Sequence, residues 1–124
     1  MATPRIRFAE LDQLIDELRN VTDPPLSVDL SSSKVRPPGV WVKVRAIRAE
    51  QLAGVTYRCT FYCMVADIEP RDAMRELETL HNLMAPLIDS LGGPTGDTEA
   101  VTVLTPDNAR LPALATPVDI DTDS

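Results

Sequence analysis

The chain has 124 residues, of which 44% are hydrophobic and 25% are charged, and its formal net charge is −7 at pH 7. This length suits one domain, and the longest apolar runs, such as residues 83–88, are too short to span a membrane. The net negative charge argues against general nucleic-acid binding, which depends on basic residues that neutralise phosphates.

The first predicted element is an amphipathic helix near the start of the chain. Acidic residues separate apolar residues that recur at helical spacing, namely Phe8, Leu11, Leu14, Ile15 and Leu18. Residues 21–39 then hold two Pro-Pro pairs and three consecutive serines, which predicts a long loop with a short extended piece around 26–30. Loops of this length inside compact domains are often functional.

Residues 40–66 alternate between apolar and polar side chains as in a β-hairpin. A turn centred near Gln51-Leu52 places Val44 opposite Cys59 and Val42 opposite Phe61 without a bulge. The other face of this hairpin then carries two aromatic and three basic side chains: Trp41, Lys43, Arg45, Arg58 and Tyr62. Because that face is partly apolar, we expect it to make a second contact.

A long helix is predicted from Pro70, which suits a first helical turn, to Gly92-Gly93, which ends the apolar stripe. Pro86 lies inside this stretch, so we expect a kink or a break into two shorter helices there.

Residues 100–104 and 114–120 read as two further strands, joined by a turn around 106–108. Pro112 and Pro117 cannot donate hydrogen bonds to a neighbouring strand, so we expect the last strand at a sheet edge. The acidic residues 119–124 are expected to form a loose tail.

This order of elements predicts an α+β fold, with an antiparallel sheet of about four strands and two helices packed on one face. Residues 1–118 would form the single domain, with its long loop at 21–39, and residues 119–124 the acidic C-terminal tail. No apolar segment that could act as a secretory signal follows Met1, so we expect the protein to be made and kept in a cytoplasm.

Charge is unevenly distributed along the chain. Residues 34–58 hold six basic residues against Glu50 alone, whereas residues 97–124 hold six acids against Arg110 alone. Two regions of opposite sign can attract each other within the fold or attract the matching region of a neighbouring copy. Two solvated faces are the simpler interpretation.

Candidate catalytic and metal-binding residues are few, and each has a simpler explanation. Cys59 and Cys63 lie too far apart along one strand to form a disulfide, so we expect buried thiols. A zinc site would need more ligands than these two cysteines and His81, the only histidine, because the chain has no second cysteine pair. We therefore expect His81 to be a structural or surface residue. The alternating acids 119–123 lack the glycine and the distal glutamate of a calcium loop. Trp41 beside Lys43 could stack nucleic-acid bases, but the aromatic content of 4% argues against it. We therefore predict no catalytic, cofactor or metal site.

The predicted elements are a short helix, a proline-rich connection ending in residues 37–42 (PPGVWV), a long hairpin, a helix of about twenty residues and a closing hairpin with residues 111–114 (LPAL). This arrangement resembles the tail terminator and related neck proteins of long-tailed bacteriophages. The resemblance covers almost the whole chain and rests on element order, size and acidity.

This resemblance implies a non-enzymatic virion protein, assembled in the cytoplasm of the bacterial host. It implies a homo-hexameric ring that caps the tail tube, ends tail polymerisation and joins the tail to the head. The partners it implies are further copies of the chain, the major tail tube protein, a head-side connector or stopper protein, and passing DNA that is not bound specifically. It implies no cofactor and no membrane contact.

Within such a ring, two sets of residues are candidates for function. We expect Lys43, Arg45 and Arg58 to contact acids of the adjacent subunit, with Trp41 and Tyr62 as apolar anchors. Asp119, Asp121 and Asp123 are candidates for acids that line the DNA channel, because they would repel phosphates.

Two alternatives stay open. One is a different neck or tail component, such as a stopper, a head-completion protein or a minor tail protein. The other, from a different class, is a small dimeric ligand-binding or enzyme subunit with its site under the long loop.

Overall fold

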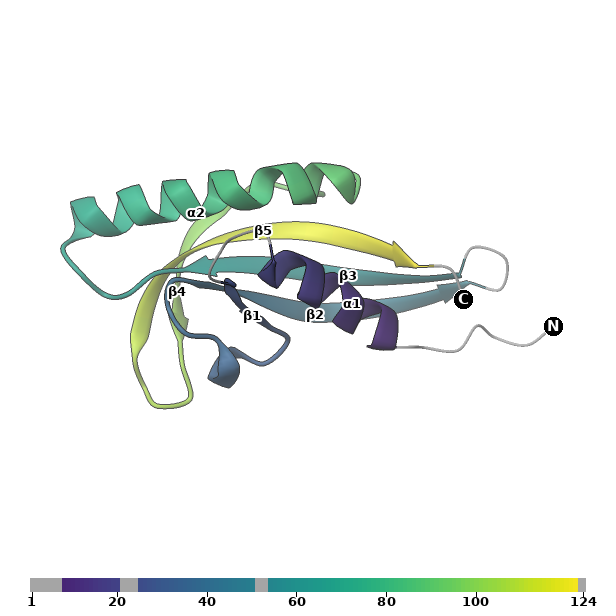
Figure 1. Ribbon diagram of the computed structural model, residues 1–124, viewed down its shortest axis with the longest axis horizontal. Coiled ribbons are helices and arrows are strands. Elements are labelled where there is room, and N and C mark those ends of the chain that lie inside the picture. Colours follow the sequence, from purple (N-terminus) through teal and green to yellow (C-terminus); the bar gives the residue numbers. More distant parts are fainter. Residues whose placement is uncertain (1–7, 21–24, 51–53, 123–124) are drawn as a thin grey trace.

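The computed structural model describes residues 8–20, 25–50 and 54–122, with side chains described for 11–20, 25–48 and 54–121. Its elements follow in the order α1 (Phe8–Arg19), β1 (Ser27–Asp29), a 3-10 turn (Ser32–Lys34), β2 (Gly39–Glu50), β3 (Gly54–Met64), α2 (Pro70–Ser90), β4 (Glu99–Leu104) and β5 (Arg110–Thr122) (Figure 1). The predicted α+β class is confirmed.

The strands form one sheet in the order β1-β2-β3-β5-β4. All neighbours are antiparallel except β1 and β2, which run parallel. The fifth strand, additional to the four predicted, is the extended piece expected around residues 26–30. It joins the sheet because Val28 pairs with Val40 and both side chains are buried in the core.

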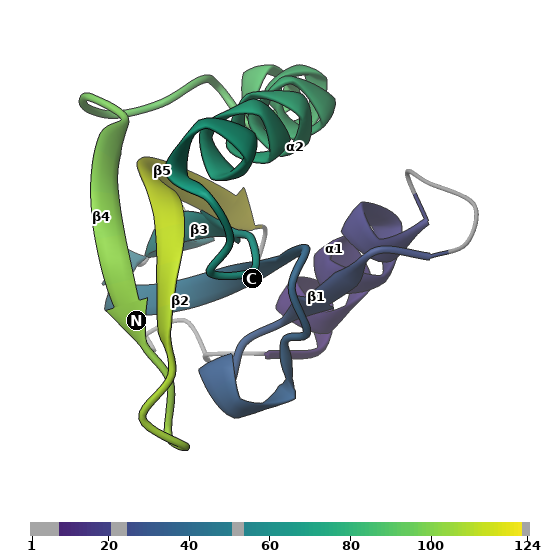
Figure 2. The ribbon, with the colours of Figure 1, turned by 90° about the vertical axis from the view of Figure 1, so that its left-hand side faces the viewer.

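Both helices pack on one face of the sheet, as predicted, and we call this the helix face. Figure 2 shows α2 above β5 and α1 beside β1. One hydrophobic cluster joins both helices to the strands, and its larger members are Leu11, Ile15, Leu18, Val42, Tyr57, Phe61, Leu77, Leu80, Met84, Ile88, Val118 and Ile120. We call the opposite surface of the sheet the open face.

The long hairpin of β2 and β3 has the predicted register in the half away from its turn. Val42 pairs with Phe61 and Val44 with Cys59. The four side chains face the core because alternation places every second residue of each strand on the helix face. The expected turn residues Gln51 and Leu52 lie outside the described part of the chain.

The second half of the hairpin differs from the prediction. The register shifts between Val44 and Ala46, so Arg45 is the extra residue of a β-bulge, and the prediction of an unbulged hairpin is wrong. The bulge has a packing reason. It brings Ile47 opposite Tyr57 and against the core, whereas unbroken alternation would have turned Ile47 to the open face.

The ends of α2 follow the predicted signals. Pro70 occupies the first turn, and the Glu69 carboxylate before it accepts hydrogen bonds from the backbone N–H groups of Arg71 at 3.0 Å and Asp72 at 3.3 Å. At the other end Gly92 and Gly93 have φ of +106° and +85°, a conformation that favours glycine.

The sequence predicts a kink or a break at Pro86, and the break does not occur, since α2 is continuous from Pro70 to Ser90. Pro86 has no N–H to give to the carbonyl of Asn82, four residues earlier. Both residues are exposed, so water can satisfy that carbonyl while the apolar stripe on the other side of the helix holds it on the sheet.

The closing hairpin is longer than predicted. Its strands are β4 and β5, and its turn lies at the expected place, where the N–H of Thr105 donates to the carbonyl of Ala109 at 2.9 Å and Asn108 has φ of 65°. However, β5 lies between β3 and β4, so the prediction that it is an edge strand is wrong.

The two prolines are tolerated inside the sheet because β3 and β4 flank different lengths of β5. The carbonyl of Pro112 accepts from the N–H of Val65, which follows the last residue of β3. The carbonyl of Pro117 accepts from the N–H of Thr95, which precedes the first residue of β4. A residue in an antiparallel strand points its nitrogen and its carbonyl to the same side. Each proline nitrogen therefore faces a side where no strand needs its hydrogen.

The prediction of a loose tail from residue 119 is also wrong, because β5 continues to Thr122. Asp119 and Asp121 turn to the open face, while Val118 and Ile120 are buried in the core. This alternation keeps the acids solvated without detaching the strand. Residues 123–124 lie outside the described part of the chain.

Candidate functional site

The open face of the sheet is covered near one end and uncovered near the other. At the covered end a second hydrophobic cluster contains Val35, Met64, Val103, Leu111 and Ala113. Val35 comes from the connection between β1 and β2, and the other four come from β3, β4 and β5. The predicted second contact of this face is therefore made partly within the subunit.

Trp41 and Tyr62, the two predicted anchors, lie together at the border of this cluster. They are directly paired across β2 and β3, and their rings stack with centroids 4.8 Å apart and planes at 21°. The Trp41 Nε1–H donates to the carbonyl of Leu30 at 3.1 Å, and the Nζ of Lys43 lies 5.7 Å from the centroid of the Trp41 ring. Both rings are half-buried, so they are fixed in position and still reach the surface.

The predicted basic residues lie beyond the stack, on the uncovered half of the open face. Lys43 pairs with Thr60, and Arg58 lies between Ala46 and Asp119 in the neighbouring strands. Lys43 and Arg58 are exposed, and neither forms an ion pair with another described residue. We call Lys43 and Arg58 the basic row.

Arg45 behaves differently from the other two predicted basic residues, because it is the bulged residue. Its Nη2 donates to the carbonyl of Cys59 at 3.4 Å. This bond ties the guanidinium to the neighbouring strand, although the side chain stays exposed. Arg45 thus contacts the neighbouring strand of its own hairpin, and its role in a subunit contact stays a prediction.

The predicted channel acids form a row directly beside the basic row. Asp119 is opposite Arg58, and Asp121 is opposite Thr56, whose hydroxyl donates to the Asp121 carboxylate at 2.6 Å. We call Asp119 and Asp121 the acidic row. The third candidate, Asp123, lies outside the described residues. Regions that are far apart in the sequence are thus adjacent on one face, because β5 inserts next to β3.

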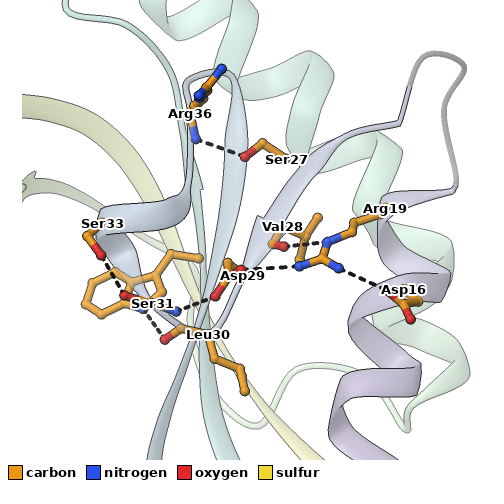
Figure 3. A network of polar contacts seen from close by, with 10 residues as sticks. Asp16, Arg19, Ser27, Val28, Asp29, Leu30, Ser31, Ser33 and Arg36 are labelled. Carbon is orange, nitrogen blue, oxygen red and sulfur yellow. Dashed lines mark hydrogen bonds and ion pairs between the residues drawn. The ribbon is translucent and has the colours of Figure 1, made fainter.

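A polar network at the β1 edge was not predicted (Figure 3). The Arg19 guanidinium donates from Nε to the carbonyl of Val28 at 2.8 Å, from Nη1 to Asp16 at 2.9 Å and from Nη2 to Asp29 at 3.2 Å. Asp29 also accepts from the N–H of Ser31 at 3.0 Å. The network occupies the outer side of β1. The only sequence signal for it is a basic residue in the last turn of α1.

The cysteines are buried and unpaired, as predicted. Desolvation raises the pKa of the Cys59 thiol to about 11, despite the opposing effect of Arg45, and raises that of Cys63 to about 12. Both side chains therefore remain neutral thiols at neutral pH, which makes them poor nucleophiles and poor metal ligands. Within the described ranges, no three His, Cys, Asp or Glu side chains are grouped so as to hold a metal ion.

His81 lies on the flank of α2 and is partly buried. Its Nδ1 atom is buried and has no hydrogen-bond partner among the described residues. The surrounding surface groove also contains Arg71, Arg75 and Glu78. No serine, threonine, cysteine or lysine is among the residues that line this groove.

Two further surface features were not predicted. A groove of about 690 Å³ runs between α2 and the end of the closing hairpin, and its lining includes Ile68, Met74, Thr102, Leu104 and Arg110. Three of these are large apolar residues with high exposure, namely Ile68 at 40%, Met74 at 56% and Leu104 at 61%. These apolar side chains are therefore grouped on the surface rather than scattered singly over it.

A smaller depression of about 340 Å³ lies under the long connection. This is the place expected for the site in the alternative of a ligand-binding or enzyme subunit. Its lining combines Ser32, Ser33 and Val35 with residues of the β4–β5 turn. It contains hydroxyl groups and the Asp107 carboxylate but neither a histidine nor a cysteine. This composition supports solvent or peptide contact better than acid–base chemistry.

Comparisons with known proteins assign no family to the chain. No protein family, no curated protein and no solved structure matches it. Among the described helices, none is long and apolar enough to cross a membrane.

Proposed function

We propose that this protein is a structural subunit of a phage virion, a tail terminator whose copies join head to tail in a homo-hexameric ring. The ring would cap the tail tube, stop its polymerisation and connect it to a head-side connector or stopper protein. One observation carries the proposal. The uncovered half of the open face presents exposed basic side chains, which form no ion pair within the described residues, next to a half-buried aromatic stack.

Such a surface favours protein contact for a physical reason. A stacked aromatic pair presents rigid apolar area whose ordering needs no further loss of conformational entropy on binding. Charged groups around it select the partner and its orientation. The stack of Trp41 and Tyr62, bordered by Lys43, has this composition.

The two charged rows support a contact between identical copies. In such a contact, the acidic row of one subunit would lie against the basic row of the next subunit, because the two rows carry opposite charge. Repetition of one such heterologous contact generates a ring when the rotation closes. The acids that we expect opposite Lys43 and Arg58 are therefore Asp119 and Asp121 of the next copy.

The DNA channel is an alternative place for the acidic row, if these acids are not covered by the next copy. Acids on a channel wall repel phosphates, which lets DNA slide without sticking. Asp119 can line a channel only if the uncovered half of the open face turns toward the ring axis. Density for an assembled ring with β5 on its exterior would remove this assignment.

The test combines tail tubes with purified protein and counts capped tubes by negative-stain electron microscopy. We expect six-membered rings at tube ends with the wild type, and at least about tenfold weaker capping at low salt with the double variant Lys43→Glu and Arg58→Glu. The matched control reverses Lys34 and Arg36, which are equally exposed on the β1–β2 connection. Equal capping by both double variants would show that the basic row is not the contact.

The same preparation separates the alternatives. Binding to DNA-filled heads rather than to tail tubes would identify a stopper or head-completion protein. Incorporation along the tail, without capping, would identify a minor tail protein. A stable dimer whose melting temperature rises with a small ligand would favour the ligand-binding or enzyme subunit.

A further inference from the structure

We propose that the free edge of β4 is a docking site for β4 of a second copy, which pairs with it antiparallel around a two-fold axis. The proposal concerns the protein before it meets other components, and it does not rest on the ring. It starts from the difference between the two edges of the sheet. At one edge, β1 is only three residues long and Arg19 occupies the carbonyl of Val28. At the other edge, the six residues of β4 pair with β5 alone among the described residues.

The β4 edge also lacks the features that normally prevent strand pairing. Its sequence, EAVTVL, contains no lysine, arginine or proline, and its single charge is Glu99 at the start. Edges of this length without such guards recruit another strand. A two-fold contact between identical edges is closed, so it covers the β4 edges of both copies and leaves no β4 edge free for a third copy.

The direction of the free backbone groups follows from the neighbouring strand. The carbonyl of Pro112 points toward the β3 side, since it accepts from the N–H of Val65. Pro112 lies opposite Thr102, so this pair exchanges no hydrogen bonds. Thr102 therefore points its own N–H and carbonyl outward, and alternation gives Ala100 and Leu104 the same direction.

One register satisfies all three of these residues at once. If Thr102 pairs with Thr102 of the partner subunit on the axis, Ala100 pairs with Leu104 of the partner subunit and the reverse, giving about six interchain hydrogen bonds. A register centred on Val101 would instead place Glu99 against Val103 of the partner subunit. Parallel pairing would bring the two Glu99 side chains together, whereas the antiparallel register separates them.

The side chains next to this edge support the same occupant. Leu104, which is 61% exposed, would lie against the small Ala100 of the partner subunit on the helix face. The groove between α2 and β4 adjoins it, so its exposed Met74 would approach the two-fold axis. A second copy therefore covers the most exposed apolar side chain of the described residues without placing a charge against it.

The first test is the mass in solution, measured by sedimentation from about 1 µM to about 1 mM protein. We expect a reversible dimer that does not grow further, and at least about tenfold weaker dimerisation for Leu104→Lys. Leu83→Lys is the matched control, because Leu83 is also a large exposed apolar residue but lies on α2 away from β4. A wild type that stays monomeric, or a control that dissociates as much as Leu104→Lys, would overturn the proposal.

The second test fixes the register and does not depend on loss of binding. In a hydrogen-bonded antiparallel pair the Cα atoms lie about 5.5 Å apart, which a disulfide tolerates. Thr102→Cys should therefore form an interchain disulfide under mild oxidation, whereas Thr79→Cys on the exposed side of α2 should not. The native Cys59 and Cys63 are buried and should not compete. Cross-linking of Val101→Cys in preference to Thr102→Cys would contradict the proposed register. If Thr102→Cys forms no interchain disulfide but the protein caps tail tubes normally, the dimer proposal is wrong and the ring proposal stands.

Discussion

At the residue scale, the Arg19 side chain joins α1 to β1 and donates three hydrogen bonds. One guanidinium ties the last turn of α1 to the backbone of β1 and to the carboxylates of Asp16 and Asp29. Arginine suits this role because its planar fork offers several donors in fixed directions. The contact holds an otherwise short edge strand against a helix.

We predict that Arg19→Ala lowers the free energy of unfolding by about 1 to 3 kcal/mol, since the carbonyl of Val28 loses its side-chain donor and Asp29 loses its ion-pair partner. Urea denaturation measures this change. Arg71→Ala, on the exposed face of α2, should change the value by less than about 0.5 kcal/mol. A loss at Arg19 no larger than that of the control would show that β1 is held by packing alone.

The buried thiols give a second prediction, on pH dependence. The folded state raises the pKa of Cys59 to about 11 and that of Cys63 to about 12, from an ordinary value of 9.0. Above about pH 9 the unfolded chain releases these protons while the folded chain keeps them, so the free energy of unfolding falls as pH rises toward 11. The stabilising contribution is complete below pH 9.

The measurement compares chemical unfolding at pH 8 and pH 10.5 for the wild type and for the double variant Cys59→Ala and Cys63→Ala. We expect the wild type to lose on the order of 4 kcal/mol more than the variant over this interval, about 2 kcal/mol for each thiol. All other residues are the same in the two proteins, so the difference isolates the thiols. Identical pH profiles would mean that the thiols meet water in the folded state.

At the element scale, β5 departs most from what its composition suggests. Two prolines and a run of acids are typical of an edge strand with a loose end, yet β5 is an inner strand with its acids in register. The flanking strands are staggered, so each proline nitrogen meets no acceptor. A sequence cannot reveal such stagger, because it depends on where two other strands end.

We predict that Ile120→Ala lowers the free energy of unfolding by about 2 to 4 kcal/mol, because Ile120 is only 3% exposed and packs in the main core. Thermal and urea unfolding both report this change. Leu83→Ala, at a more exposed site on α2, should lower it by less than about 1 kcal/mol. A negligible effect at Ile120 would restore the loose tail that composition predicts.

Local signals predicted the other elements well. The caps of α2 and the pairing of Val42 with Phe61 follow from residue types and alternation. The bulge at Arg45 and the parallel pairing of β1 were not predictable in this way. Both depend on which side chains the core needs from distant parts of the chain, here Ile47 and Val28.

At the scale of the whole molecule, the sequence placed the aromatic pair and the basic residues on one face of the hairpin correctly. It did not predict that acids more than fifty positions later lie beside them, because that requires the strand order β3-β5. The open face is therefore a surface of mixed charge. In the proposed ring, one small domain would thus present both halves of the contact between copies.

The strand order has a consequence for how the chain is made. Since β5 joins β3 to β4, none of the elements from α1 through α2 can cover the second side of β3. During translation Phe61 and its neighbours are only partly enclosed by the first hairpin, and the sheet closes when the hairpin of β4 and β5 pairs with β3. The pairing of β5 with β3, which are distant in the sequence, should thus limit the folding rate. Chaperones that bind extended segments can bind the chain before this pairing forms.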